Sequence, residues 1–332
     1  MLREYRMPPS IVERMSQSRF LRKYLGHPYL LANMSIWNHL PMSVISLRPV
    51  RAFGCYLHGL IQLRVTRMQQ LGTFFFRNRP ELELLSSLLH QTPLGSTVDV
   101  TVLACSKGAE VYSISYTIRC ARPDLKVRLR ALDIDRSVLE FAKGGVYSLR
   151  HHNASGPNCL FERDHVAMNT ARDQKTSIFE RTSSAEMGAM FDRDEDQVTV
   201  KPQFREGIDW HLGDARDPGL VDVLGLQDIV VANRFLCHMH PREAEACLRN
   251  LAQLVKPGGY LFVSGVDLSV RSKVAGELRW RPVTDLIREI HEGDPSLRHD
   301  WPAAYWGLEP IDQRRIDWKM RYASVFQLGR SV

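Results

Sequence analysis

Apolar and polar positions follow two periodicities between residues 97 and 265. Short apolar runs typical of buried strands cover 98–104, 127–135, 228–233 and 260–265. Segments with apolar residues at helical spacing lie between them, at 110–121, 137–147 and 242–255, and the Pro-Gly-Gly at 257–259 is expected to end the last helix. This alternation predicts an α/β fold with a doubly wound, Rossmann-like parallel sheet. Its ligand should lie beyond the carboxyl ends of the strands.

Three other regions depart from this rhythm. Residues 1–95 are predicted to form a helical domain of short amphipathic helices broken at Pro41 and Pro49, and 96–332 a second domain. Within the second domain, the polar segment 151–206 is read as an inserted lobe, and 317–329 as a closing strand pair. The loop with Trp301, Tyr305 and Trp306 is either a lid or, more simply, core. The first domain has helically spaced apolar residues at Phe53, Leu57, Leu60, Ile61 and Val65.

Positive charge is concentrated at the start of the chain. Residues 1–80 contain twelve lysines and arginines against two acids, Glu4 and Glu13, whereas the whole chain has a formal charge of +7. A basic segment beside a slightly acidic remainder indicates an anionic small molecule, an acidic protein segment or an anionic membrane surface as partner. A solvated basic face without a partner explains the charge equally well. Nucleic acid is disfavoured, because no binding motif accompanies the arginines.

The composition is that of an ordinary soluble protein, with 44% hydrophobic and 24% charged residues. We expect neither a signal peptide nor a transmembrane helix, because the first residues are polar and no apolar run is long enough to span a bilayer. Peripheral contact with a membrane through the basic part stays open. The six cysteines have no C-x-x-C pair or framework spacing, so free thiols in a reducing, cytoplasmic compartment are expected.

Polar residues follow the predicted strands where a ligand should lie. The loop Ala104-Cys105-Ser106-Lys107-Gly108-Ala109-Glu110 has only one glycine, which makes it a poor phosphate cradle. Glu110 suits the first turn of a helix on structural grounds alone, but it also offers an anion to a cationic ligand. The next strand ends in Asp133-Ile134-Asp135. Asp133 suits a ribose, and Asp135 is the better helix cap.

An acid suited to ribose without a pyrophosphate loop indicates a nucleoside that carries no phosphate. S-adenosylmethionine fits this description. Glu110 would meet its ammonium, and Arg77 is a candidate for its carboxylate. Gly213-Asp214-Ala215 is the kind of loop that borders an adenine ring, and Asn233-Arg234 follows the strand that begins at Asp228.

Five segments resemble, in order and spacing, the CheR family of chemotaxis-receptor glutamate methyltransferases over roughly residues 65–270. They are TFFFR (73–77), ACSKGAEVYS (104–113), ALDIDRSVLEFAKGGVYS (131–148), VTVKPQFREGIDWHLGDA (198–215) and DIVVANRFLCHMH with LAQLVKPGGYLFVSG (228–265). The resemblance implies a basic helical N-terminal domain, a class I S-adenosylmethionine-binding domain and a small inserted β-subdomain.

Carried over by position, the family motifs imply roles for individual residues of this chain. Thr73 and Arg77 match the N-x-T-x-F-F-R motif, whose Asn is Leu71 here. Asp133 matches the ribose-binding Asp, and His238 stands where the family has the Tyr that faces the transferred methyl group. The resulting set is catalytic His238 and Thr73, with cofactor contacts from Thr73, Arg77, Ala104, Ser106, Gly108, Glu110, Asp133, Ile134, Asp214, Ala215, Asn233 and Arg234.

Departures from the family pattern fall mainly on the side of the methyl acceptor. Besides Leu71 and His238, Ala109 replaces a family Glu, Asp214 stands where the family has Asn, and Asp267 ends a changed G-x-S-E segment. We therefore expect a methyltransferase that forms a methyl ester on a small-molecule or acyl carboxylic acid, with S-adenosyl-L-homocysteine as product. Two alternatives stay open: a chemoreceptor glutamate methyltransferase, and an inactive cofactor-binding sensor or scaffold.

A metal site is the weaker reading of the histidines. His238 and His240, with His211 and Asp214 nearby in the predicted sheet, are residue types that bind zinc. No fourth ligand is evident, and methyl transfer needs no metal. We therefore expect none.

Overall fold

The computed structural model describes residues 27–45, 47–63, 71–149, 177–293 and 301–329. The helices near the start are α3 (His27–Asn38), α4 (Met42–Ile45), α5 (Arg48–Gln62) and α6 (Arg79–Leu89). The sheet region contains β1 (Thr97–Leu103), α7 (Ala109–Ala121), β2 (Lys126–Asp133), α8 (Arg136–Gly144), β6 (Ile208–Leu212), α11 (Leu220–Leu224), β7 (Gln227–Val231), the 3-10 turn η4 (Leu236–His238), α12 (Pro241–Ala252) and β8 (Val255–Phe262). The remaining elements are β3 (Val146–Ser148), α9 (Ser184–Met190), β4 (Phe191–Asp194), β5 (Gln197–Val200), α10 (Pro202–Arg205), α13 (Leu268–Glu277), β9 (Arg281–Pro282), α14 (Ile287–Glu292), α16 (Trp318–Tyr322) and β10 (Val325–Gln327).

The main sheet has seven strands in the order β6-β2-β1-β7-β8-β10-β9. Strands β6, β2, β1, β7 and β8 are parallel to their neighbours, while β10 runs antiparallel to both β8 and β9. The chain moves outward from β1 to β2 and β6 on one side, and from β7 to β8 on the other. The doubly wound α/β prediction is therefore confirmed, and the strand order reverses between β1 and β7.

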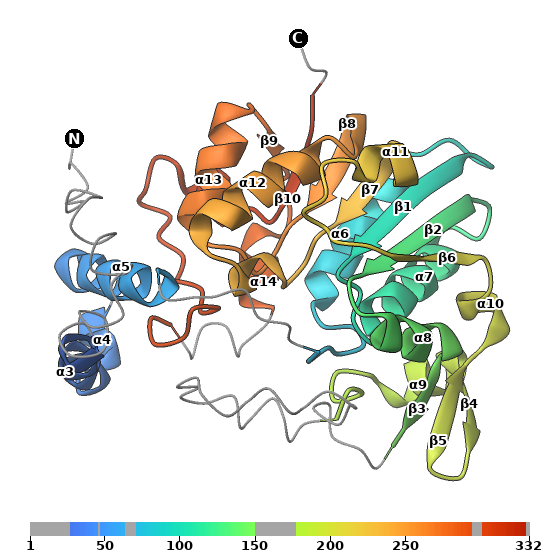
Figure 1. Ribbon diagram of the computed structural model, residues 1–332, viewed down its shortest axis with the longest axis horizontal. Helices are drawn as coiled ribbons and strands as arrows, with labels where there is room; N and C mark the ends of the chain where they lie inside the picture. Colours follow the sequence, from blue (N-terminus) through green and yellow to red (C-terminus); the bar gives the residue numbers. More distant parts are fainter. Residues whose placement is uncertain (1–26, 46, 64–70, 150–176, 294–300, 330–332) are drawn as a thin grey trace.

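Apolar side chains of the central strands alternate between two cores, one on each face of the sheet. Val100 and Val102 of β1 belong to the core beneath α6, α7 and α8, whereas Leu103 belongs to the core beneath α11, α12 and α13. Both sets are almost completely buried. Figure 1 shows helices on both faces of the sheet. This arrangement explains the continuous apolar runs of these strands, because each strand is covered on both sides.

A separate three-stranded antiparallel sheet, in the order β3-β5-β4, forms a small lobe. The lobe packs on the segment before α6 through an aromatic cluster, in which Phe75 stacks on Phe179 at 5.2 Å between ring centroids and meets Tyr147 and Phe191 edge-on. Residues 150–176 of the predicted insertion lie outside the described residues. The lobe thus anchors one wall of the region beyond the strand ends.

Several predicted element boundaries are wrong. The helix predicted for 137–147 ends at Gly144, where Gly145 has a φ of +65°, and Val146 already belongs to β3. The helix predicted to reach 255 ends at Ala252, and the Pro-Gly-Gly lies inside β8. The tail predicted as a strand pair is the helix α16 followed by one strand, β10. Strand pairing accounts for the first two boundaries, because Val146 pairs with β5 and β8 pairs with β7 from Val255 onward.

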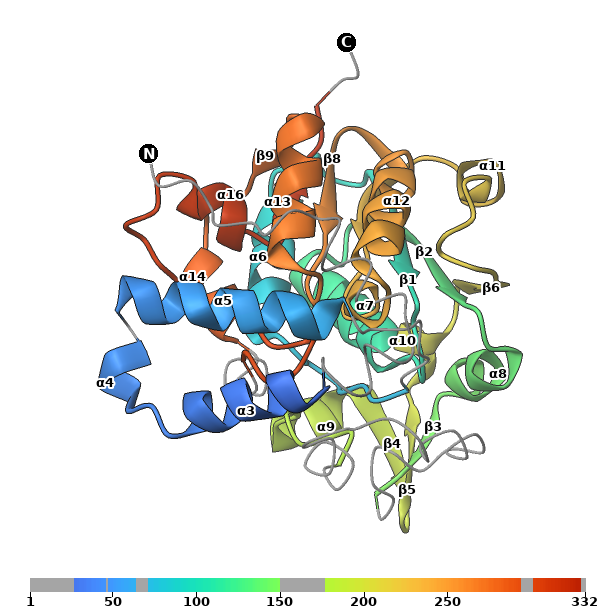
Figure 2. The same ribbon diagram turned by 60° about the vertical axis from the view of Figure 1, so that its left-hand side comes forward.

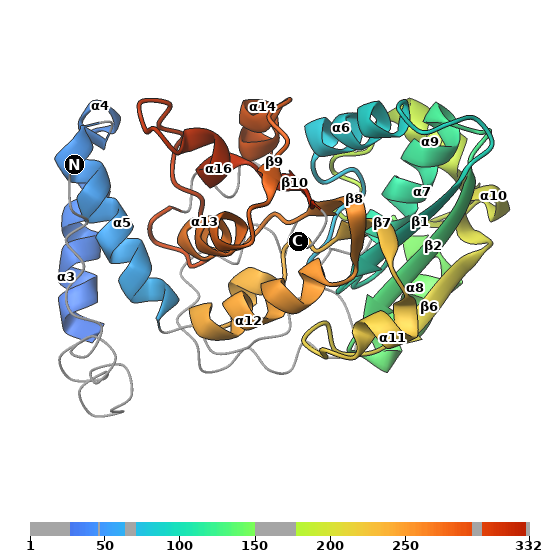
Figure 3. The same ribbon diagram turned by 90° about the horizontal axis from the view of Figure 1, so that it is seen from above.

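Helices α3–α5 lie at the end of the molecule away from β1, β2 and β6 (Figure 3), and Figure 2 shows α5 below α13 and α16. They share a small apolar core in which Trp37 and Leu57 meet Trp301. Pro49 does not break a helix but occupies the first turn of α5, where its missing N–H costs nothing. Val65 and residues 1–26, which hold much of the predicted basic charge, lie outside the described residues.

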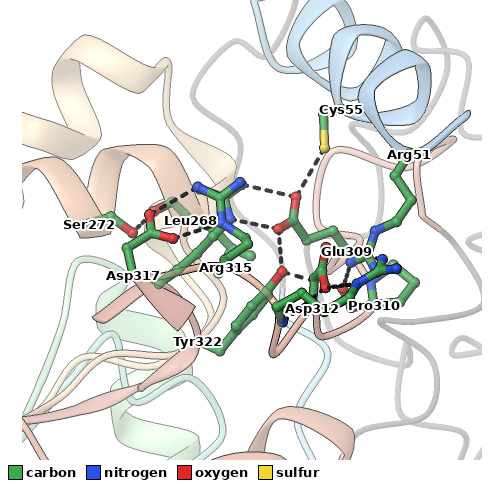
Figure 4. A network of polar contacts seen from close by, with 12 residues as sticks. Arg51, Cys55, Leu268, Ser272, Glu309, Pro310, Asp312, Arg315, Asp317 and Tyr322 are labelled. Atoms are coloured by element: carbon green, nitrogen blue, oxygen red, sulfur yellow. Dashed lines mark hydrogen bonds and ion pairs between the residues drawn. The ribbon is translucent and has the colours of Figure 1, made fainter. Parts of the chain in front are cut away.

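Glu309 joins α5 to the C-terminal segment (Figure 4). Its carboxylate accepts hydrogen bonds from Arg321 Nε at 2.6 Å and Tyr322 Oη at 2.8 Å, and Cys55 Sγ of α5 donates to it at 3.1 Å. Burial alone would raise the pKa of Glu309, but these hydrogen bonds and the charge of Arg321 outweigh burial and lower the pKa to about 2. Arg51 of α5 also donates to the carbonyl oxygen of Pro310.

None of the helices in the described parts of the chain is long and apolar enough to cross a membrane. The five cysteines in the same parts are free thiols, and Cys159 lies outside them.

We predict that Glu309→Gln lowers the free energy of unfolding by about 3 kcal/mol, because it leaves the buried Arg321 charge without its partner. The pKa of Glu309 is below its ordinary value, so its contribution is complete above pH 4.5 and is lost as the pH falls toward 2. Denaturant unfolding at pH 7 and pH 3 measures both effects. Asp317→Asn, at an exposed ion pair, is the control and should cost under about 1 kcal/mol.

Candidate functional site

A cavity of about 280 Å³ lies at the carboxyl ends of β1, β2 and β7, where the strand order reverses. This is the place that the doubly wound topology assigns to a ligand. Every residue of the predicted site except Gly108 lines it, including Thr73 and His238. Residues from the loop before α6, the loop between β1 and α7, the end of β2 and the turn after β7 therefore meet in one place. The other lining residues are Leu71, Gly72, Cys105, Leu132, Gly213, Phe235 and Met239.

Gly108 does not line the cavity, and its glycine has a different explanation. It begins α7 with a φ of +82°, in the left-handed region that favours glycine. A Cβ at this position would lie 3.0 Å from the Cβ of Ala142 in α8. The residue therefore permits the tight turn and the close approach of two helices.

Asp133 fixes the loop after β1. Its Oδ2 accepts the backbone N–H of Ser106 at 2.7 Å, and its Oδ1 accepts that of Asp135 at 3.0 Å. Each carboxylate oxygen still has a free lone pair. Asp133 can therefore also accept hydrogen bonds from two neighbouring hydroxyl groups. Asp135 instead caps α8 by accepting the backbone N–H of Ser137 at 2.8 Å, as predicted.

Glu110 lies in the first turn of α7 with its carboxylate buried. Burial raises the pKa of Glu110, and the hydrogen bond from Asn233 and the charges of Arg77 and Arg234 oppose this increase. Nδ2 of Asn233 donates to Glu110 Oε1 at 2.9 Å. A buried carboxylate that faces a cavity gains strongly from a cationic ligand group, because the low dielectric strengthens their attraction.

The same Asn233 amide also donates to Glu81 Oε1 at 2.5 Å, and its Oδ1 accepts both the N–H and the hydroxyl of Ser264. All four hydrogen-bonding positions of the amide are therefore used within the protein. Asn233 serves the cavity by holding Glu110. Glu81 was not among the predicted site residues, since a Glu in a helix's first turn ordinarily has a structural explanation.

Three cavity residues hold strained backbone conformations. Ala104, Ser106 and Arg234 have φ angles of 52°, 48° and 65°, in a region that costs non-glycine residues on the order of 1–3 kcal/mol each. Ser106 Oγ donates to the carbonyl of Leu71 at 3.0 Å, which joins two walls of the cavity. Strain gathered at one cavity is typical of a functional site.

Arg77 forms part of another wall of the cavity. Its guanidinium donates to the carbonyl of Gly72 at 2.8 Å and lies 5.2 Å from the ring centroid of Phe74. The neighbouring Phe75 is the residue anchored in the small lobe. The TFFFR segment therefore positions its arginine at the cavity by burying the phenylalanines behind it.

His238 is partly buried and lines the cavity. Burial, together with the charges of Arg234 and Arg77, lowers the pKa of His238 to about 3, so the imidazole is neutral at physiological pH. Its Nδ1 lies 2.8 Å from the hydroxyl oxygen of Tyr305. Tyr305, expected to belong to a lid or to the core, thus stands directly behind His238, and it meets Trp306 edge-on.

The histidines considered for a metal site do not gather. His240 accepts the backbone N–H of Arg242 and so caps α12. Across the residues that the structure describes, no group of three or more His, Cys, Asp or Glu side chains has an arrangement for a metal ion.

Two family models match the chain. The model of the CheR methyltransferase, S-adenosylmethionine-binding domain, matches residues 72–160, and a methyltransferase domain model matches residues 179–263. The two ranges contain almost all of the cavity, from Gly72 to Met239.

Curated relatives are distant and longer. The probable biofilm formation methyltransferase WspC of Pseudomonas aeruginosa is 24% identical over 245 residues, which are 72% of this chain and 52% of that protein. An uncharacterized 104.1 kDa protein in the hypE 3' region of Rhodobacter capsulatus is 26% identical over 273 residues, 78% of this chain and 24% of that protein. The chain thus spans about half and about a quarter of the length of these relatives.

Solved structures show only a broad likeness. The magnesium protoporphyrin IX methyltransferase of Synechocystis with bound S-adenosylmethionine is 14% identical, covers 61% of this chain and 69% of its own, and has a TM-score of 0.33. A putative S-adenosylmethionine-dependent methyltransferase of Methanococcus maripaludis is 9% identical, with 77% and 89% coverage and a TM-score of 0.34. Scores this low carry no argument about function.

The two matched models and the cavity that they enclose define the class: the chain contains an S-adenosylmethionine-dependent methyltransferase domain. Within this class, the match over residues 72–160 and the likeness to WspC support a divergent methyltransferase of CheR type.

The residues present fit S-adenosylmethionine. Asp133 suits the ribose hydroxyls and Glu110 the ammonium, while Arg77 offers a cation to the carboxylate. Ile134, 47% exposed at the cavity, offers an apolar surface to the adenine ring. The loop after β1 has no additional glycines for a pyrophosphate, in agreement with a phosphate-free nucleoside.

We predict that Asp133→Asn and Glu110→Gln each weaken S-adenosylmethionine binding by roughly 10–100-fold, since a hydrogen bond to a charged group contributes about 1.5–3 kcal/mol. Isothermal titration calorimetry measures the affinity. Asp135→Asn is the matched control, because Asn caps a helix as well as Asp does, and its affinity should stay unchanged. Unchanged affinity in Asp133→Asn would contradict the ribose assignment.

Proposed function

We propose that the chain transfers a methyl group from S-adenosylmethionine to a carboxylate oxygen of a small-molecule or acyl acid, forming a methyl ester and S-adenosyl-L-homocysteine. The observation that carries this proposal is the neutral, weakly basic His238. An amine or hydroxyl acceptor has a proton to lose, and an imidazole with a pKa of about 3 removes it poorly. A carboxylate is already a nucleophile and needs no base.

The charges around His238 support the same acceptor. Arg77 and Arg234 both lower the pKa of His238, which means that their positive potential reaches its ring. That potential attracts an anion to this side of the cavity. His238 then contributes as a neutral hydrogen-bonding partner whose orientation is set by Tyr305. Phe235 and Met239 beside it limit access of water.

The cofactor, when bound, supplies an electrophilic methyl group on a sulfonium. The chain's residues have the tasks of alignment and exclusion of water, which are worth on the order of 7–11 kcal/mol in a well-aligned reaction. Asp133 orients the ribose of the cofactor and Glu110 its ammonium group. His238 orients the acceptor oxygen, and no residue has to transfer a proton.

A second candidate is methylation of a protein glutamate, as in the CheR family. It is favoured by the CheR model match and uses the same carboxylate chemistry. The changes at Leu71, Ala109 and His238 favour the small acid instead, because they fall on residues that the resemblance assigns mainly to the acceptor side.

Labelled methyl groups distinguish these candidates. The protein is incubated with methyl-labelled S-adenosylmethionine and a cell extract, and the products are separated by size and treated with base. We expect label in the small-molecule fraction that base releases as volatile methanol. Base-labile label in membrane protein would support the glutamate candidate, and base-stable label would refute ester formation. If no fraction of the extract becomes methylated, the result would support an inactive cofactor-binding sensor instead.

We predict that Tyr305→Phe lowers the turnover rate by about 3–10-fold, the value of one neutral hydrogen bond, while cofactor affinity stays unchanged. The reason is that the Tyr305 hydroxyl contacts the His238 ring, which is not among the residues assigned to the cofactor. Turnover is measured by formation of S-adenosyl-L-homocysteine. Tyr260→Phe, whose hydroxyl contacts Gln327 away from the cavity, is the control. Equal rates for the two variants would remove Tyr305 from the site.

A further inference from the structure

A second, smaller chamber lies behind the wall that Glu110 and Asn233 give to the cofactor cavity. Its volume is about 40 Å³, and it shares Arg77, Glu110, Asn233 and Arg234 with that cavity. Its far side includes Glu81 of α6, Arg271 of α13 and Ser324 before β10. The chamber therefore adjoins the end of the site assigned to the amino-acid part of the cofactor.

Three of the chamber's side chains are buried with a polar atom that has no hydrogen-bond partner. These atoms are Glu81 Oε2, Arg271 Nε and Ser324 Oγ, on residues that are 6%, 2% and 8% exposed. Arg271 uses its two terminal nitrogens on the carbonyls of Val263 and Arg321, each at 3.0 Å. Buried polar atoms are seldom left unpaired, and a cavity of this size holds ordered water.

Glu81 links this chamber to the cofactor site through its other oxygen. Glu81 Oε1 accepts from Asn233 Nδ2 at 2.5 Å, and the same nitrogen donates to Glu110 Oε1 at 2.9 Å. The amide is thus held between two carboxyl groups. Removing the Glu81 contact takes away one of the four hydrogen bonds that orient the Asn233 amide, the others being those from Ser264 and to Glu110, and so weakens the fixed position of the donor to Glu110.

The charge state of Glu81 agrees with such a role. Burial, followed by the nearby charge of Glu110, raises the pKa of Glu81 to about 8, against the opposing effects of Asn233, Arg234 and Arg271. At neutral pH the group is therefore a neutral acid. It accepts the Asn233 hydrogen bond without placing a second negative charge beside Glu110, and its O–H can donate into the chamber.

We propose that Glu81 is a positioning residue of the cofactor site: through Asn233 it holds Glu110 toward the ammonium group of the cofactor. The chamber behind it is a water site, in which ordered water joins Glu81 Oε2, Arg271 Nε and Ser324 Oγ. This role concerns cofactor binding and does not depend on the identity of the methyl acceptor.

The experiment compares two ligands that differ at the relevant end. S-adenosyl-L-homocysteine contains the amino-acid part, whereas 5'-methylthioadenosine has the same adenosine and lacks that part. We expect Glu81→Leu to weaken S-adenosyl-L-homocysteine binding by at least tenfold and 5'-methylthioadenosine binding by less than twofold. Glu81→Gln, which still accepts from Asn233, should stay within threefold for both. An equal loss for both ligands, or a loss for neither, overturns the proposal.

A double-mutant cycle tests whether Glu81 acts through Glu110. In a Glu110→Gln background, Glu81→Leu should cause little further loss of S-adenosyl-L-homocysteine affinity, because the group being positioned is already changed. Additive losses overturn the proposed route. Glu83→Leu, at an exposed position on the same helix, is the control and should bind both ligands normally.

If Glu81→Leu does not fold, Glu81→Asp, which has a shorter side chain, takes its place. This substitution keeps the carboxyl group but moves it away from Asn233. The affinity for S-adenosyl-L-homocysteine should therefore fall by a smaller factor than in Glu81→Leu, and the affinity for 5'-methylthioadenosine should not fall. A high-resolution crystal structure of the unaltered protein tests the water site directly. Water within hydrogen-bonding distance of Glu81 Oε2 supports it, and an empty chamber refutes it.

Discussion

The parallel pairing of β1 with β2 on one side and β7 on the other is the constraint on which the site depends. This pairing brings the carboxyl ends of the three strands to one edge of the sheet. Asp133 ends β2, and Asn233 follows β7 two residues after its last residue. Their segments are separated along the chain by α8, the small lobe, α10, β6 and α11. Because both faces of these strands are buried in apolar cores, their register is strongly specified.

The cavity gathers buried charge that would be costly without partners. Asp133 is held by two backbone N–H groups, and Glu110 by an amide between two carboxyl groups. Arg234 and Arg77 bring the opposite charge, and burial together with these charges keeps His238 neutral. In a low dielectric these groups act strongly on whatever enters. The arrangement therefore favours a ligand that has both cationic and anionic ends, which S-adenosylmethionine has.

The segment from Trp301 to Leu328 connects the N-terminal helices with the site. Trp301 packs against Trp37 and Leu57, Tyr305 reaches His238, and Glu309 binds Cys55 of α5. His58 of α5, buried and with its Nδ1 3.3 Å from the carbonyl of Pro302, adds a further contact. The helices α3–α5 thus hold in place the loop that contacts His238, although they lie away from β1, β2 and β6.

Much of the fold followed from the sequence alone. Periodicity identified the parallel strands and their helices, since a strand buried on both faces and an amphipathic helix leave patterns that local residues decide. The polar residues at the strand ends could be named for the same reason: a doubly wound sheet has one place for its ligand. Element ends were less predictable. Pairing with β5 made Val146 part of a strand, and β8 includes the Pro-Gly-Gly because β7 pairs with residues on both sides of it, with a register shift between them.

Only the tertiary structure decided which side chains support the site from behind. Glu81 lies 152 residues from Asn233, and Tyr305 lies 67 residues from His238. Neither belongs to a motif, and each has an ordinary structural explanation when seen in the sequence. Their roles arise from the packing of α6 and of the C-terminal loop against the strand ends. Sequence determined the strand-end residues that face the cavity because their positions follow from local periodicity and topology, and the family resemblance added Thr73 and His238. Contacts between distant segments instead depend on how those segments pack.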